Sequence, residues 1–206
     1  MVPKLLDFGV FSGHHWLAYS HIKGSVWQTG TRHVAQLLGR LHDQSEFSEL
    51  QLGVNGSAQL AAQTRAILTK CQTTGHLQDL APSGSVAPLT KFTLIHGDPV
   101  PGNLVEHDGT ITLIDWQCPQ MGDPAEDLAI FLSPAMQLLY RGLPLSKGEV
   151  DEFLSAYPDR QVVERLQDLR PWYHWRMAAY CLWRQERGAA DYAQALELEM
   201  AALDVC

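Results

Sequence analysis

The chain has 206 residues, of which 46% are hydrophobic and 18% charged, with a formal net charge of −8 at pH 7. This length can bury a substantial core, and the composition is that of a globular protein. The negative charge and the absence of a Lys/Arg-rich run argue against nucleic acid as a partner.

Two short strands are predicted near the start of the chain, over 5–10 and 16–19, with a turn at Ser12-Gly13. An isolated two-stranded hairpin is only marginally stable in water. We therefore expect these strands to need neighbours that the chain does not obviously contain, and their open edges to favour self-association.

Two helices are predicted next, over 31–42 and 57–71, because apolar residues recur there at helical spacing. The following segment, 73–88, is rich in Gly, Ser, Pro and Thr and is expected to be a loop. These helices indicate that the chain turns mainly helical after its N-terminal strands.

A hairpin is predicted in the middle of the chain, with strands over 103–105 and 110–114. Asp-Gly between two apolar runs is a strong hairpin signal. The antiparallel pairing places Asn103 at the start of one strand and Asp115 at the end of the other, side by side. Asp98 lies in the loop just before them.

Most of the chain after this hairpin is predicted to be helical. One helix is expected over 125–140, and a capping-box pattern at 146–149 starts another. Two more are expected over 161–187, broken near Pro171, and over 190–203.

Three polar side chains, Asp98, Asn103 and Asp115, are therefore expected to converge. A loop carboxylate can accept a proton from a substrate hydroxyl, and an amide oxygen beside a second carboxylate suits Mg²⁺. Together these are the components of phosphoryl transfer. A metallohydrolase site that adds His96 and His107 is less favoured, because His107 falls at the far end of the hairpin from Asp115.

The linked motifs are His96-Gly97-Asp98 with Asn103 at the fifth position after Asp98, then Ile114-Asp115-Trp116, then GDPAEDLA over 122–129. This succession resembles the aminoglycoside phosphotransferase and choline kinase family, whose fold is similar to that of protein kinases. Segments 16–24 and 37–42 resemble the hinge of that family and the helix after it.

The resemblance implies an α+β fold. Residues 27–206 are expected to form a mostly helical C-terminal lobe with a small catalytic hairpin, and residues 1–26 a two-stranded remnant of the N-terminal lobe with the hinge. Family members hold the ATP phosphates with a glycine-rich loop and a strand lysine upstream of the hinge. Here only 1–19 precede the hinge, and Lys4 stands in the wrong place for that lysine.

The resemblance also implies that Asp98 is the catalytic base and that Asn103 and Asp115 hold Mg²⁺. The implied reaction moves a phosphoryl group from ATP to a hydroxyl of a small molecule such as an aminoglycoside, choline, thiamine or a sugar. The alternative is a phosphotransferase-like binding module, or truncated fragment, that no longer catalyses.

Four supporting residues follow from the same resemblance. The hinge backbone around Ser20 and Ile22 is expected to bind adenine. Asp127 is expected to brace the catalytic loop as a hydrogen-bond acceptor, and His96 to be structural within that loop.

Five aromatic residues lie close together in the helical stretch predicted over 161–187. They are Trp172, Tyr173, Trp175, Tyr180 and Trp183. They could line a site for a cationic amine, and the acidic chain is compatible with a cationic substrate. Their near-helical spacing nevertheless favours packing in the core.

The four cysteines are far apart and contain no Cys-x-x-Cys pair, which argues against structural zinc. No apolar run is long enough to span a bilayer, and the first ten residues do not read as a secretory signal. We therefore expect a cytoplasmic protein with reduced thiols and no membrane partner.

Overall fold

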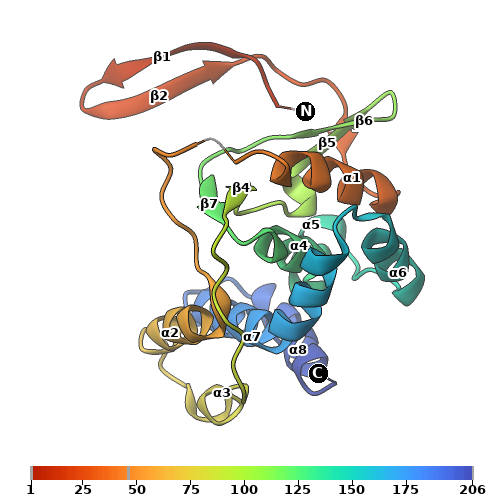
Figure 1. Ribbon diagram of the computed structural model, residues 1–206. Coiled ribbons are helices and arrows are strands. Elements are labelled where there is room, and N and C mark those ends of the chain that lie inside the picture. Colours follow the sequence, from red (N-terminus) through yellow and green to blue (C-terminus); the bar gives the residue numbers. More distant parts are fainter. Residues whose placement is uncertain (1, 46, 206) are drawn as a thin grey trace.

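An N-terminal hairpin lies above a largely helical body (Figure 1). The structure is a computed structural model that describes residues 2–45 and 47–205. Strands β1 (Leu5–Phe11) and β2 (His14–Tyr19) pair antiparallel, with Phe11 opposite His14. Ser12 and Gly13 both have positive φ at the turn, so the predicted hairpin is confirmed.

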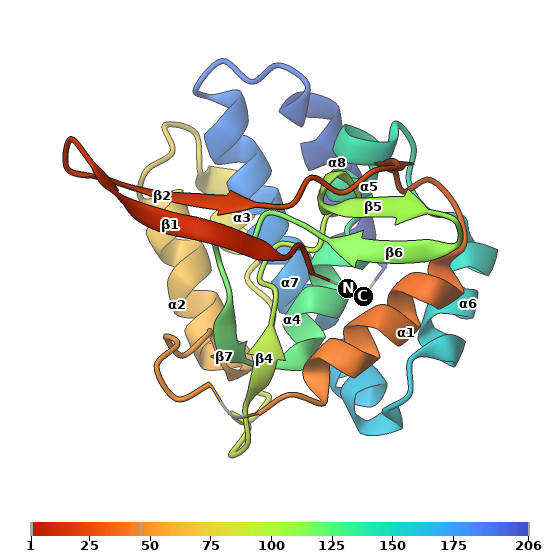
Figure 2. The same cartoon turned by 90° about the horizontal axis from the view of Figure 1, so that it is seen from above.

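Two further small sheets lie beside this hairpin when the molecule is seen from above (Figure 2). In one, the strand order is β3-β5-β6, formed by β3 (Ser25–Val26), β5 (Leu104–His107) and β6 (Thr110–Leu113). In the other, β4 (Thr93–Ile95) pairs with β7 (Gln120–Gly122). The β5–β6 hairpin was predicted, whereas β3 and β7 are too short to show an alternating pattern.

Helices make up the rest of the body. Their bounds are α1 Thr31–His42, α2 Gly56–Leu68, α3 Gly75–Asp79, α4 Pro124–Leu132, α5 Pro134–Arg141, α6 Lys147–Ala156, α7 Arg160–Gln185 and α8 Tyr192–Leu203. The predicted capping box is present, because Ser146 and Glu149 exchange hydrogen bonds at the start of α6. Helix α3 is a short addition within the segment that was expected to be a loop.

The helix predicted over 125–140 is in fact two helices, α4 and α5, that meet at Ser133. The Ser133 side chain accepts a hydrogen bond from the backbone N–H of Met136 and so caps α5. Pro134 follows at the first position of the new helix, where its missing N–H has no consequence. The Ser133-Pro134 pair inside this apolar run therefore marks the start of a new helix.

The break predicted at Pro171 is wrong, because α7 continues through it from Arg160 to Gln185. Proline removes one backbone hydrogen bond, but the residues around it are held by packing. Leu169, Trp172 and Trp175 are buried against neighbouring elements. Tertiary packing supplies most of the stability of a helix in a protein and here outweighs the local defect.

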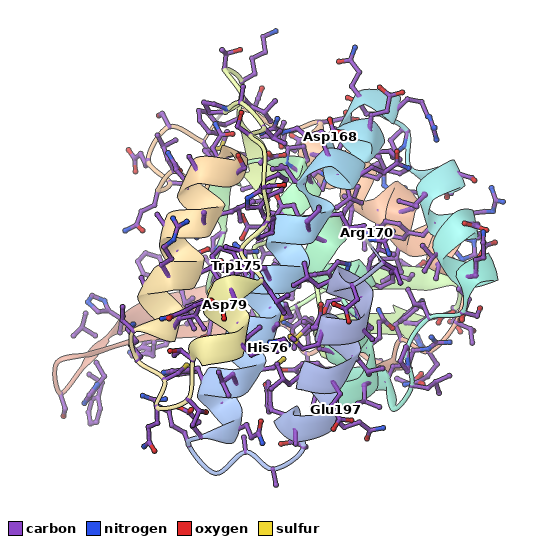
Figure 3. All side chains as sticks on the ribbon, turned by 90° about the horizontal axis from the view of Figure 1, so that it is seen from below. His76, Asp79, Asp168, Arg170, Trp175 and Glu197 are labelled. Atoms are coloured by element: carbon purple, nitrogen blue, oxygen red, sulfur yellow. The ribbon has the colours of Figure 1, made fainter. Side chains whose placement is uncertain are left out.

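Helix α7 is the central element of the lower body. It lies between α2 and α3 on one side and α8 on the other (Figure 3). Trp175 points toward α3, and its indole N–H donates to the carbonyl oxygen of Leu77 over 2.6 Å. Among the described residues, no helix has both the length and the apolar character that a membrane span requires.

The main core lies between α1, α4, α6 and the underside of the β5–β6 hairpin. Trp27 meets Phe131 edge-on at 5.2 Å between ring centroids, and Phe131 stacks on Phe153 at 4.8 Å. Leu104 and Leu113, one on each strand of the hairpin, are buried in the same core. The hairpin that carries the candidate site is thus fixed from below.

Candidate active site

Asp98 and Asn103 contact each other directly. Asp98 follows β4, and Asn103 ends a short 3-10 turn, Pro101–Asn103, that leads into β5. The Asn103 Nδ2 group donates to the Asp98 carboxylate over 3.1 Å and to the Asp98 carbonyl oxygen over 2.8 Å. The side-chain oxygen of Asn103 has no hydrogen-bond partner in the described part of the chain, so it remains available as a ligand.

Asp115 lies at the same end of the hairpin as Asn103. Leu104 pairs with Leu113, and the Asn103 carbonyl oxygen accepts a hydrogen bond from Ile114 N–H over 3.0 Å. The predicted side-by-side placement is therefore confirmed. Asp115 has φ of 62°, in the left-handed region that non-glycine residues rarely adopt. Such backbone conformations cluster at functional sites because the surrounding structure must hold them.

The Asp98 carboxyl has an environment suited to accepting a proton. Burial raises its pKa above the ordinary value, and the negative charges of Asp115 and Asp127 raise it further. The hydrogen bond from Asn103 opposes these effects without cancelling them. A raised carboxyl pKa makes a stronger base than a free aspartate.

Asp127 holds the backbone of the loop that carries Asp98. It lies in the first turn of α4 and is fully buried. Its two carboxylate oxygens accept hydrogen bonds from the N–H groups of His96 and Gly97, each over 2.8 Å. A carboxylate at this position is also stabilised by the helix dipole, so the loop is fixed to the start of a rigid helix.

Two further residues support Asp127 from behind, and the sequence analysis did not identify them. His42 Nε2 lies 3.0 Å from the Asp127 carboxylate, and His42 Nδ1 lies 2.7 Å from the hydroxyl of Tyr157. Burial raises the pKa of Tyr157, so the phenol stays protonated and can donate to Nδ1 while Nε2–H donates to Asp127. The available signal was His42 on the apolar face of α1, one turn after Leu38, since a buried polar residue needs a partner.

His96 connects the loop that carries Asp98 to the β5–β6 hairpin. Its Nε2 lies 3.0 Å from the carbonyl oxygen of Ile114, and its Nδ1 lies 3.3 Å from the backbone nitrogen of Asp98. Nε2–H therefore donates to Ile114, and Nδ1 accepts from Asp98. The ring also packs edge-on against Trp116 at 4.6 Å between centroids.

Gly97 is required between these two residues. Its φ is +81°, and a Cβ atom built there would come within 2.4 Å of the Cys118 carbonyl oxygen. Any side chain would therefore meet backbone that cannot move aside cheaply, in addition to the strain of the left-handed conformation.

Asp123, which begins the Asp-Pro segment of the third motif, has a structural role. It caps α4 by accepting from Ala125 N–H over 3.0 Å, and it forms an ion pair with Arg165 at 2.6 Å. Arg165 also donates to the Ala87 carbonyl and to Asn55. This buried carboxylate thus ties α4 to α7 and to the segment after α3.

A cleft of about 1030 Å³ opens between the N-terminal hairpin and the helical body. Apolar side chains from both sides line it, and Asp115 and Trp116 lie at its wall. The apolar lining includes Leu5, Leu17, Tyr19, Leu37, Leu41, Leu94 and Leu113. Its size and apolar character are typical of a cofactor site.

The predicted hinge residues lie next to this cleft but not in its wall. Ser20 N–H donates to the Lys4 carbonyl oxygen over 2.8 Å, and Ser20 Oγ accepts from Lys4 N–H over 3.0 Å. Ser20 thus extends the hairpin pairing. In the described part of the chain, the backbone of Ile22 makes no hydrogen bond, and Tyr19 is the nearest hinge residue that lines the cleft.

The donor set fits Mg²⁺ better than a metal held by protein alone. Within 2–45 and 47–205, no three or more His, Cys, Asp or Glu side chains gather as a metal site. Asp115 and the free oxygen of Asn103 are hard oxygen donors, and Mg²⁺ is usually bound by one or two carboxylates plus phosphate oxygens and water. A bound triphosphate would therefore complete the coordination.

The comparisons with known proteins agree with this geometry. A family model described as the APH phosphotransferase enzyme family matches residues 1–166. No curated protein sequence gives a match. Solved structures with the same fold include a choline/ethanolamine kinase family protein from Mesorhizobium loti, with 12% identity and a TM-score of 0.62 over 100% of this chain and 79% of that one.

Two further structures show the same fold. Spectinomycin phosphotransferase, solved with ADP and spectinomycin, has 13% identity and a TM-score of 0.61 over 98% of this chain and 77% of that one. An ethanolamine kinase from Plasmodium vivax has 14% identity and a TM-score of 0.60 over 96% of this chain and 67% of that one. The α+β, protein-kinase-like fold class is confirmed, and by its family match this chain belongs to the APH phosphotransferase enzyme family.

Proposed function

We propose that this chain transfers the γ-phosphoryl group of ATP to a hydroxyl of a small molecule. The observation that carries the proposal is the contact of Asn103 with Asp98 beside Asp115, at the wall of a large cleft. Family membership supports phosphotransfer as the class of reaction. The specific acceptor follows from neither.

In this proposal Asp98 accepts the hydroxyl proton of the acceptor as the oxygen attacks phosphorus. The hydrogen bond from Asn103 fixes the orientation of the carboxylate, and Asp127 fixes the loop through His96 and Gly97. Mg²⁺, when bound through Asp115 and the Asn103 oxygen, neutralises phosphate charge. Most of the catalytic effect then comes from positioning and electrostatic stabilisation.

We place the adenine of ATP in the apolar part of the cleft, near the hinge backbone at Ser20 and Ile22. Leu17 and Tyr19 line this part from the hairpin, and Leu113 from below. Two spectinomycin phosphotransferase structures, described as bound to ADP and to AMP, support a nucleotide in this fold. We also propose that the chain divides into two parts at the hinge, with residues 1–26 above the cleft and residues 27–206 below it.

A second candidate function is nucleotide binding without turnover. Arg40 is the one Lys or Arg among the described residues that line the cleft. A triphosphate needs several cationic or backbone N–H partners, so a cleft with one cationic side chain can hold the adenosine part of ATP while orienting its γ-phosphate poorly. This observation favours a binding module over an efficient kinase.

The experiment that separates the two is ADP release with choline, thiamine, an aminoglycoside and sugars as acceptors, beside Mg·ATP binding measured by calorimetry. Acceptor-dependent ADP release that disappears in Asp98→Ala is the expected result. Mg·ATP binding without ADP release for every acceptor would support the binding module instead, and no binding would refute both.

We further propose that the N-terminal hairpin pairs with that of a second copy. Its strands expose large apolar side chains, including Phe8 at 69% and Phe11 at 75% exposure. Both edges of a two-stranded sheet are open to pairing. Sedimentation velocity is expected to show dimers or larger species that Phe8→Lys reduces, whereas Leu143→Lys, at an exposed site on the helical body, leaves them unchanged. A monomer at all concentrations would contradict this.

We also propose a cytoplasmic location. Cys71, Cys118 and Cys181 are free thiols, as expected for a reducing compartment. Cys206 lies outside the described residues.

A further inference from the structure

A cluster of three tyrosines and an arginine lies beside Asp98 and does not line the nucleotide cleft. Tyr140, near the end of α5, packs against the turn between Asp98 and Asn103. A Cβ atom built on Gly102 would come within 2.6 Å of its ring. Burial raises the pKa of Tyr140, and the negative charge of Asp98 raises it further, so the two groups lie within electrostatic range.

The cluster continues from Tyr140 to α7 and α8. The Tyr180 ring meets the Tyr192 ring edge-on at 5.9 Å, and the Arg184 guanidinium lies over the Tyr192 ring at 5.0 Å. Helix α5, which carries Tyr140, packs against α8, which begins at Tyr192. The Arg184–Tyr192 pair therefore lies near the tyrosine that contacts the catalytic loop, and the positive charge of Arg184 lowers the pKa of both tyrosines against the larger effect of burial.

The Arg184 guanidinium has no carboxylate partner among the described residues. The charged residues just after α7 are engaged elsewhere: Arg187 donates to the carbonyl oxygens of Trp183 and Lys70. Glu186 accepts hydrogen bonds from Gln72 and Thr73. Arg184 is half-buried, and within the described part of the chain its charge is balanced only by the Tyr192 ring and the C-terminal end of α7. Guanidinium groups pair best with planar carboxylates and phosphates.

The same region is poorly suited to a cationic amine. An aromatic cage needs free ring faces, but Arg184 already covers a face of Tyr192 and Arg187 lies over Trp183 at 4.5 Å. Trp172, Tyr173 and Trp175 are buried in the core, as their spacing favoured. A cation would therefore have to displace a guanidinium and would still meet its repulsion.

We propose that the phosphoryl acceptor carries an acid group, a carboxylate or a phosphate, and that Arg184 binds this group while the acceptor hydroxyl lies at Asp98. This inference rests on the proposed role of Asp98 and adds a substrate class to it. Tyr140 interacts electrostatically with both Asp98 and Arg184 and, as a protonated phenol, can donate a hydrogen bond to such an acceptor. Hydroxy acids and phosphorylated alcohols are the matching compounds.

Equilibrium binding tests this without requiring turnover. Calorimetry of the full chain is expected to show glycerate and glycerol 3-phosphate binding at least about tenfold tighter than glycerol or ethanolamine, the range of a hydrogen-bonded charge pair. The two acids distinguish a carboxylate from a phosphate site. Arg184→Gln is expected to remove the preference, and Arg184→Lys to keep part of it.

Arg160→Gln, at the opposite end of the same helix and exposed, is the matched control and should leave binding unchanged. Ethanolamine binding as tightly as glycerate, an acid preference that survives Arg184→Gln, or no measurable binding of either acid would each overturn the inference. Asp98-dependent phosphorylation of a neutral or cationic alcohol would overturn it while leaving the proposed function intact. Arg184-dependent acid binding without turnover of any acceptor would overturn the proposed function and leave Arg184 as an acid-binding site only.

Discussion

Asp98→Asn is expected to lower kcat/KM by about 10²–10⁴-fold, the usual contribution of a general base, and at the same time to raise the melting temperature. Asparagine keeps the shape of the side chain and an oxygen that can accept from Asn103. It cannot take up the proton of an acceptor hydroxyl. Binding of Mg·ATP, measured by calorimetry, should remain within a few-fold of the original chain.

The expected gain in stability follows from the direction of the pKa shift. Burial and the charges of Asp115 and Asp127 raise the folded-state pKa of Asp98 above that of the unfolded chain. The folded protein therefore holds this proton more tightly, and protonation of Asp98 stabilises it. At neutral pH the ionised carboxylate destabilises the fold, and this cost is removed as the pH falls through the folded pKa.

Two pH dependences check this directly. The acid limb of the pH profile of kcat/KM should lie above the pKa of an ordinary aspartate, because the base acts only when deprotonated. The melting-temperature advantage of Asp98→Asn should be largest at neutral pH and shrink in acid. Asp168→Asn, which removes a charge at an exposed position on α7 (Figure 3), is the control for net charge. An unchanged or lower melting temperature in Asp98→Asn at neutral pH would contradict the assigned environment.

The sequence predicts those features of the site and fold that depend only on short segments of the chain. Asp-Gly sets the β5–β6 turn, and the register that follows from it brings Asn103 and Asp115 to one end. Ser146 and Glu149 mark the start of α6 through a capping box that needs only four residues. In these cases the residues of one short segment determine its conformation.

The part that could not be predicted depends on contacts between distant segments. His42 and Tyr157 lie on α1 and at the end of α6, and nothing local to either indicates that they meet behind Asp127. The unbroken course of α7 through Pro171 is another case, since the packing of Trp172 and Trp175 is a property of the folded body. The proposed role of Arg184 likewise depends on its position near Tyr140 and Tyr192, which come from other helices.

Asp127→Ala is expected to destabilise the protein by at least about 3 kcal/mol, because it leaves three hydrogen-bond donors without their acceptor and each such loss costs about 1–3 kcal/mol. The change leaves the N–H groups of His96 and Gly97 and one nitrogen of His42 without their acceptor, and the contacts to His96 and His42 are buried. Urea unfolding measures the loss. Asp151→Ala, which removes an exposed ion pair with Lys147, should change stability by less than about 1 kcal/mol.

A double-mutant cycle tests whether Tyr157, His42 and Asp127 act as one unit. Tyr157→Phe removes a single hydroxyl and is expected to destabilise by about 1–3 kcal/mol, because it leaves a buried ring nitrogen of His42 unsatisfied. If the chain of hydrogen bonds is coupled, the double variant Tyr157→Phe/Asp127→Ala loses less than the sum of the two, by about 0.5–3 kcal/mol. Additive losses would show that Tyr157 supports only the end of α6. A non-additive result, with kcat lowered in Tyr157→Phe and KM for ATP unchanged, would show that the Tyr157 hydroxyl helps to position the Asp98 loop.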